Sequence, residues 1–278
     1  MLFVIAAALS ITCLNLIMRY STTKTETLCG VILGNYLTAA SIMALLVLSN
    51  GGGNVSAFTI GLGAMTGLTY SAGMYLNLKL MGKRGAAITS SMIQLAVLIP
   101  IGVSVFFYGE TISSTQLIGI ILAVSSLPLL AAKPMEKLEL DREVIPMILV
   151  AITVVGFSQL SSKILVQSGL EAQNNYFFLA VFSSAALLVS PLAWRNRSGI
   201  KRRDGLFGLG VGMFNVAANR FLLLALTTLP GAIVFPVSSA GSLLLVSISA
   251  IILFKEKVSQ VNLAGILLTL AAVVLINL

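Results

Sequence analysis

Apolar stretches of membrane-spanning length recur along the whole chain of 278 residues. A hydrocarbon core about 30 Å thick needs roughly 20 apolar residues in a helix that rises about 1.5 Å per residue. Such windows fall at 1–18, 28–48, 57–78, 86–107, 115–132, 144–166, 173–193, 205–226, 232–254 and 260–277. The gaps between them are too short to fold independently. The sequence therefore predicts an all-α polytopic membrane protein with ten transmembrane helices.

The amino-acid composition excludes a water-soluble surface and argues against a nucleic-acid partner. Hydrophobic residues make up 58% of the chain and charged residues only 9%, whereas a typical soluble domain carries about 25% charged residues. The net charge of +8 sits in small basic groups between apolar stretches, which is typical of cytoplasmic membrane loops. The two cysteines offer neither a disulfide framework nor a metal-ligand cluster. We expect a lipid bilayer and a small-molecule substrate as partners, and no nucleic acid.

A motif is repeated at a constant displacement of 146 residues, which divides the chain into halves. The first copy contains Glu110, Ser113, Gln116, Leu117, Gly119 and Ile120, and the second contains Glu256, Ser259, Asn262, Leu263, Gly265 and Ile266. The same displacement relates the segment that begins at Gly85 to the segment that begins at Gly231. Two separate segments that agree on one register indicate an internal duplication.

The duplication predicts three parts: a first five-helix repeat at 1–132, a polar linker at 133–143 and a second five-helix repeat at 144–278. Because each repeat has an odd number of spans, the second must enter the membrane upside down relative to the first. We therefore expect two inverted five-helix repeats, an arrangement typical of secondary transporters.

The charges of the loops support this inversion independently. In the first half the basic residues follow spans one and three, and in the second half they follow spans seven and nine. The two sets are Arg19, Lys24, Lys79, Lys83 and Arg84, and Arg195, Arg197, Lys201, Arg202, Arg203, Lys255 and Lys257. An inverted repeat places all of them on one side, which the positive-inside rule assigns to the cytoplasm. The sequence thus predicts a multi-pass protein of the inner or plasma membrane with both termini on the non-cytoplasmic side, although Lys163 and Arg220 fall toward the opposite side.

The repeated motif of Glu110 and Glu256, with Ser113, Gly119, Ser259 and Gly265, resembles the one that closes each half of EamA-type members of the drug/metabolite transporter superfamily. The resemblance covers the length, the ten spans, the duplication and the basic residues Arg19 and Lys163 near the ends of spans one and six. It implies a carrier that moves small organic molecules, amino acids or drugs across the membrane by alternating access, frequently as an exporter. It does not identify the substrate.

Enzymatic chemistry is not expected, because the necessary side chains are missing from the spans. The chain contains no histidine, and none of its nine acidic residues lies in the middle of a span. We therefore expect no catalytic residue, no metal and no cofactor. Glu110 and Glu256 lie at the repeat junctions, where capping of a helix end or an interhelical salt bridge is the favoured role.

Polar residues inside spans are candidates for a substrate site, since they normally face protein or a water-filled cavity. In span eight, Gly205, Gly208, Gly212, Asn215 and Asn219 recur at steps of three and four residues and share one helix face. For the glycines, close helix packing is the favoured interpretation. For the two asparagines, interhelical hydrogen bonds and a cavity lining both remain open.

Arg220 is a full-time cation inside a span, and two interpretations of it remain open. Its side chain either extends to the membrane interface or recognises a substrate carboxylate or phosphate. The remaining candidates for substrate binding are polar residues in five other spans, for which packing is the alternative: Asn15, Tyr70, Asn77, Gln94, Gln159 and Ser239.

The span residues favour an anionic or zwitterionic organic substrate such as an amino acid, because the full charges within the windows are all basic. Drug or quaternary-ammonium transport is an alternative, in which Tyr70, Tyr75 and Tyr176 offer cation–π contacts. A lipid-carrier flippase and a non-transporting membrane partner subunit are further alternatives. The direction of transport, and whether the protein is a monomer or a homodimer, stay open.

Overall fold

The computed structural model describes residues 1–25, 28–50, 53–84, 93, 95–131, 144–254 and 259–276. Within them the chain is almost entirely helical. The long helices are α1 (Leu2–Thr22), α2 (Cys29–Ser49), α3 (Ala57–Arg84), α6 (Ser114–Ala131), α7 (Val144–Gln167), α8 (Asn174–Arg195), α9 (Arg202–Thr228), α10 (Gly231–Phe254) and α11 (Gln260–Ile276). The fourth window is represented by a short series of segments: η1 (Leu95–Val97), α5 (Leu98–Gly102) and the π-helical η2 (Val103–Phe107).

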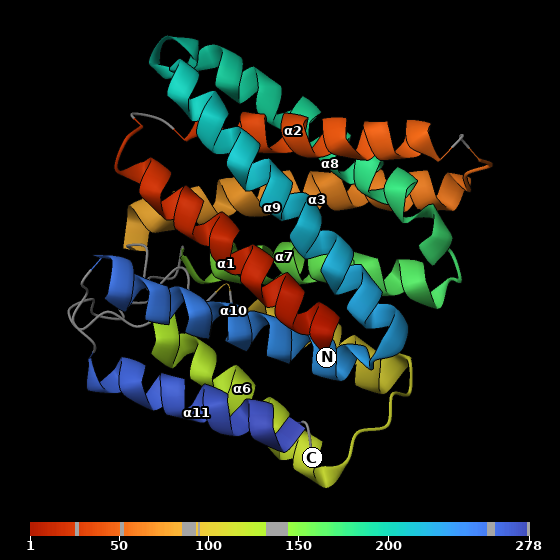
Figure 1. Cartoon of the computed structure of the whole chain (residues 1–278), viewed down its shortest axis with the longest axis vertical. Helices are drawn as coiled ribbons and strands as arrows, with labels where there is room; N and C mark the ends of the chain where they lie inside the picture. The colour runs from red at the N-terminus through yellow and green to blue at the C-terminus, as the bar shows by residue number, and fades with distance from the viewer. Residues whose placement is uncertain are drawn as a thin grey trace.

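The helices form one bundle in which most neighbours come from opposite halves of the chain. Helix α9 packs against α1 and α2, and α3 packs against α7 and α8. Helix α1 also packs against α10, and α5 packs against α7. Helix α6 packs along α11. In Figure 1, α1 runs toward the left side of the bundle and α7 runs toward the right. The first helices of the two halves therefore have opposite directions.

Glycines determine how closely the two halves approach at the α2–α9 crossing. A Cβ atom added at Gly208 would lie 2.7 Å from Gly34 Cα and 2.8 Å from the carbonyl oxygen of Val31. One added at Gly212 would lie 2.7 Å from the carbonyl oxygen of Asn35. The packing interpretation of Gly208 and Gly212 is thus confirmed, whereas a Cβ at Gly205 would meet nothing within 4 Å.

The repeated sequence motif performs the same structural tasks in both halves. Ser113 and Gln116 hydrogen-bond to each other's backbone N–H at the start of α6, and Ser259 and Asn262 do the same at the start of α11. These are reciprocal capping arrangements that satisfy two otherwise unpaired donors of a helix end.

The motif glycines Gly119 and Gly265 allow α6 and α11 to pack closely. A Cβ at Gly119 would lie 3.1 Å from the nitrogen of Ile276, and one at Gly265 would lie 2.9 Å from the nitrogen of Leu130. Gly265 follows Gly119 by 146 residues, and Ile276 follows Leu130 by the same number. The two contacts are therefore reciprocal, as contacts across a two-fold axis are.

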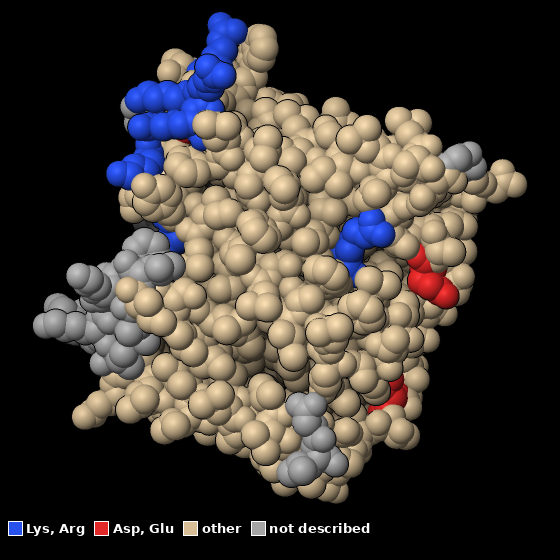
Figure 2. Space-filling view, viewed as in Figure 1, with Lys and Arg blue, Asp and Glu red and all other residues tan. Residues whose placement is uncertain are grey.

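The surface has the charge distribution of a multi-pass membrane protein. Among the described residues, six helices are long and apolar enough to cross a membrane: α1, α2, α7, α8 with the turn before it, α9 and most of α10. Figure 2 shows a broad uncharged surface, with most Lys and Arg at the upper left, a further basic side chain right of centre, and acidic residues at the right. The basic group includes the exposed Arg195, Arg197, Lys201, Arg202 and Arg203 of the α8–α9 connection. We call the left side of Figures 1 and 2 the basic face and the right side the acidic face.

Candidate functional site

A chain of side-chain hydrogen bonds links three helices in the interior of the bundle. The Tyr70 hydroxyl donates to Asn219 Oδ1 at 2.9 Å, and Asn219 Nδ2 donates to Asn215 Oδ1 at 2.7 Å. Asn215 Nδ2 then donates to Asn35 Oδ1 at 3.0 Å. We call Asn35, Tyr70, Asn215 and Asn219 the amide network. All its bonds run in one direction, so each polarises the next.

The amide network joins the two halves of the chain. Asn35 comes from α2 and Tyr70 from α3, whereas Asn215 and Asn219 lie one turn apart on α9. Asn35 and Asn215 are buried, with 9% and 7% of their surfaces exposed. The network leaves the Asn35 amide nitrogen without a hydrogen bond among the described residues, and Tyr70 and Asn219 are only partly buried. The arrangement can therefore offer donors and acceptors to a polar solute.

Helix α3 shows that Tyr70 is directed away from the outer surface. The exposed residues of this helix include Met65, Leu68 and Tyr75, which recur at steps of three and seven residues. Tyr70 lies on the opposite side of the helix. Asn77, two helical turns later, lies on that side too. Tyr75 instead lies on the exposed side, and Tyr176 bonds the backbone of Gly53 in a connection between helices. Of the three tyrosines considered for cation–π contact, only Tyr70 reaches the network.

Arg220 lies on the outward side of α9, away from the amide network. The exposed residues Leu206, Met213 and Leu224 are spaced by seven and eleven residues, and Arg220 falls one turn before Leu224 on the same side. Asn215 and Asn219 lie on the side that packs against α2. The structure therefore does not bring Arg220 together with the other predicted ligands, and extension of its side chain along the outer surface explains its position.

Asn15 and Gln159 face inward yet keep exposed surface. Asn15 is exposed although it shares a face of α1 with Val4 and Ala8, which are 1% and 5% exposed. Gln159 is half-buried and follows Val155 by one turn, and Val155 is the side chain nearest to a Cβ built at Gly73 of α3. Both amides therefore keep exposed surface on helix faces that contact neighbouring helices.

The other predicted ligands are not part of the amide network. Asn77 is half-buried, and its Oδ1 atom is buried without a hydrogen-bond partner among the described residues. Ser239 is half-buried in α10, where its backbone oxygen accepts a hydrogen bond from the Ser242 hydroxyl. Gln94 lies outside the described residues. Asn15, Asn77, Gln159 and Ser239 thus stay predictions.

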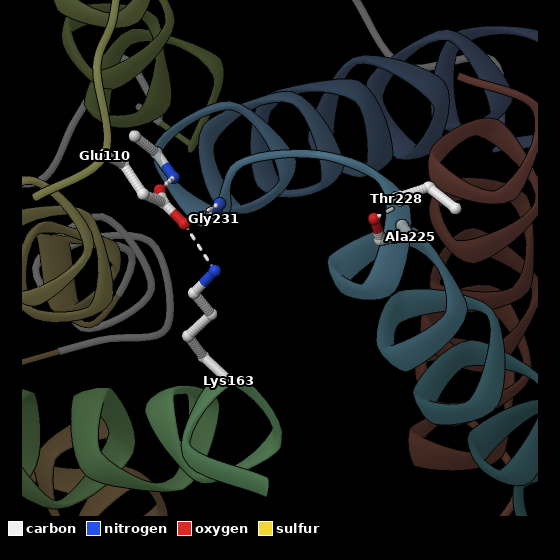
Figure 3. A network of polar contacts seen from close by, with 6 residues as sticks. Glu110, Lys163, Ala225, Thr228 and Gly231 are labelled. Carbon is white, nitrogen blue, oxygen red and sulfur yellow. Dashed lines mark hydrogen bonds and ion pairs between the residues drawn. The ribbon is translucent and has the colours of Figure 1, made fainter. Parts of the chain in front are cut away.

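A second polar cluster lies near the acidic face. Glu110, in the connection before α6, forms an ion pair with Lys163 of α7. Its oxygens also accept the backbone N–H groups of Gly231 and Ala232 at the start of α10, both at 2.9 Å. Figure 3 shows Glu110 and Lys163 meeting beside this helix end. Glu110 therefore both caps a helix and bridges the two halves, which confirms the role favoured for it.

The stabilising effect of Glu110 is expected to disappear in acid. Burial raises the pKa of its carboxyl group, but the hydrogen bonds from Lys163, Ala232 and Gly231 outweigh burial and hold the pKa below the ordinary 4.5. A lowered pKa stabilises the fold above the unfolded-state pKa, and this contribution is lost as pH falls through the folded-state pKa. The difference in melting temperature between wild type and Glu110→Gln should be largest near neutral pH and shrink below pH about 4. A constant difference down to the most acidic pH would contradict the ion pair.

Two features of the site were not predicted from the sequence. Asn35 lies in an apolar window and attracts no attention there, but it directly follows Gly34, which contacts Gly208. Matching the small residues of the two spans would have pointed to this part of α2. The partner of Lys163 was also missed, because Glu110 lies 53 positions away in the other half.

Comparison with known proteins agrees with this architecture. The model of the EamA-like transporter family matches residues 143–278. A solved crystal structure, described only as that of a protein, is similar over 100% of this chain and 97% of its own, with a TM-score of 0.80 and 14% sequence identity. At that identity the likeness concerns the fold alone, and it extends through the first half of the chain. No curated protein matches the sequence significantly.

Proposed function

Because the chain belongs, through residues 143–278, to the EamA-like transporter family, we propose that it is a secondary transporter of a small polar organic metabolite. The family points to a transporter in a membrane rather than to an enzyme. The observation that carries the proposal is the amide network, in which polar side chains of α2, α3 and α9 meet between the two halves. Substrate sites of secondary transporters commonly lie at such an interface between repeats.

The proposed architecture is a pair of inverted five-helix repeats that alternate access to the network. Three observations support it: the opposite directions of α1 and α7, the reciprocal contacts of Gly119 and Gly265, and the matched capping arrangements of α6 and α11. In this scheme the Glu110–Lys163 pair closes the acidic face while the network faces the basic one.

The proposed substrate is net-neutral or zwitterionic, such as an amino acid. The amides and the phenol of the network offer hydrogen bonds without a full charge. Lys163, the buried cation of the spans, is neutralised by Glu110, and Arg220 points outward. Hydrogen-bonding groups that fix a polar ligand amid apolar walls are the usual composition of a small-molecule site. Export is the direction that the resemblance to EamA-type carriers implies.

The transport proposal is tested with the purified chain in liposomes. Uptake of radiolabelled amino acids against a preloaded pool is measured for wild type, Asn219→Leu and Arg220→Gln. Removing Asn219 breaks two of the three side-chain hydrogen bonds of the network. We expect at least a tenfold loss of transport, because an unpaired polar group in a binding site costs about 1–3 kcal/mol. Arg220→Gln, one residue away but outward, is the matched control and should retain transport. Absence of exchange by wild type for every amino acid would contradict the substrate class.

The proposed orientation places the basic face in the cytoplasm and both termini outside. A fluorescent protein that matures only in the cytoplasm, fused after residue 278, is expected to stay dark, whereas the same fusion inserted at Ser198 of the α8–α9 connection should be bright. The positive charges of that connection supply the physical reason. A bright C-terminal fusion together with a dark loop insertion would reverse the topology.

A further inference from the structure

The carboxylate of Glu110 occupies a site whose three donors all belong to the second half of the chain. Glu110 Oε1 accepts hydrogen bonds from the Lys163 ammonium and from the backbone N–H of Gly231. Glu110 Oε2 accepts a hydrogen bond from the backbone N–H of Ala232. We call these three donors the carboxylate cradle. A helix N-terminus combined with a cation favours an anion strongly, because both the backbone dipoles and the charge act on it.

The cradle is enclosed by protein rather than open to solvent. Lys163 is only 2% exposed, and Ser104 of η2 is fully buried. The Ser104 hydroxyl oxygen has no hydrogen-bond partner among the described residues, and a Cβ atom at residue 231 would clash with it. Glycine at position 231 therefore lets this unused hydroxyl approach the cradle. Capping of α10 does not require this additional unpaired hydroxyl beside Gly231.

The cradle lies closer to the acidic face than the amide network does. Lys163 is four residues from the end of α7, which corresponds to about 6 Å of helix. Asn219 is nine residues from the end of α9, or about 14 Å. Both of these helix ends are at the acidic face (Figure 1). A solute that moved from the network toward the acidic face would therefore pass the depth of the cradle.

We propose that the carboxylate cradle is a binding site for a substrate carboxylate, which Glu110 occupies while the acidic face is closed. This inference rests on the proposed transport function and deepens it by naming carboxylates as the chemical class. When the two halves separate at this face, Glu110 leaves with the first half and the cradle stays with the second. A carboxylate that binds there compensates the buried Lys163 charge, so it stabilises the open state relative to the closed one.

The test uses formate as the probe and thermal unfolding of the purified protein as the measurement. In Glu110→Ala the cradle is vacated, so replacing chloride by formate at constant ionic strength should raise the melting temperature by several degrees in a saturable way. Wild type should not respond, because Glu110 fills the site. Glu171→Ala is the matched control, since Glu171 is an exposed acid on the same face, and it should not respond either. Glu110→Ala/Lys163→Met should lose the response.

A folded Glu110→Ala that ignores formate overturns the inference, and so does an equal response in the variant that lacks Lys163. If Glu110→Ala cannot be recovered in chloride, Glu110→Ser is measured in the same way and decides the question by the same criteria. The liposome assay with Asn219→Leu does not involve the cradle. Failure of the formate response therefore leaves the transport proposal standing, and a formate response in a protein that moves no solute refutes the transport proposal alone.

Discussion

Glu110→Gln is expected to lower the free energy of unfolding by about 3–5 kcal/mol, the usual cost of removing one partner of a buried ion pair. Glutamine cannot neutralise Lys163, whose side chain is only 3% exposed. A cation is therefore left in a low-dielectric interior. The melting temperature of the purified protein should fall by on the order of 10 °C near neutral pH.

Lys163→Met is expected to cost less than Glu110→Gln. After that change the Glu110 carboxylate keeps its hydrogen bonds from Gly231 and Ala232. The double variant should be more stable than the sum of the single losses predicts, because neither charge remains unpaired. Strictly additive losses would show that the two residues do not form a pair.

Gly208→Ala is expected to destabilise the α2–α9 crossing by about 3 kcal/mol, the upper part of the range for overpacking. The added carbon would approach Gly34 Cα and the Val31 carbonyl oxygen within 2.8 Å, and both are backbone atoms that no side-chain rotation can move. The two helices would have to separate, and the hydrogen bond between Asn215 and Asn35 would then be lost. The melting temperature and the fraction of monodisperse protein measure this effect.

Gly205→Ala is the matched control on the same helix. Its Cβ would meet nothing within 4 Å, and alanine has the better helix propensity by about 1 kcal/mol. It should therefore be neutral or slightly stabilising. If both alanine variants were equally stable, close packing would not define the interface between the halves.

The sequence predicted the helices well because the bilayer imposes a simple rule on length and polarity. It placed the boundaries less well where helices extend beyond the apolar core. Helix α3 continues to Arg84 rather than to 78, and α9 begins at Arg202 rather than at 205. Charged residues at those ends lower the hydropathy, but they do not stop a helix. The described part of the fourth span is broken into η1, α5 and η2, which hydropathy alone does not reveal.

The candidate site was predicted in part, and the reason lies in helix rotation. The spacing of Asn215 and Asn219 showed that they share a face, and Tyr70 was a candidate through its polarity within a span. Arg220 was grouped with them because charge in a membrane suggests function. Its position on the outward side depends on the packing of α9 against α1 and α2, which one helix's sequence does not contain. Asn35 was missed for the same reason.

The most direct test of an internal solute pathway is labelling of single cysteines by a membrane-impermeant thiol reagent. In a background without Cys13 and Cys29, cysteines replace the inward amides Asn15 and Gln159, and Leu9 and Leu149 on the outward sides of the same helices serve as controls. We predict that positions 15 and 159 react from the cytoplasmic side and that the two leucine positions do not. Reaction at the leucine positions with none at positions 15 and 159 would contradict the pathway.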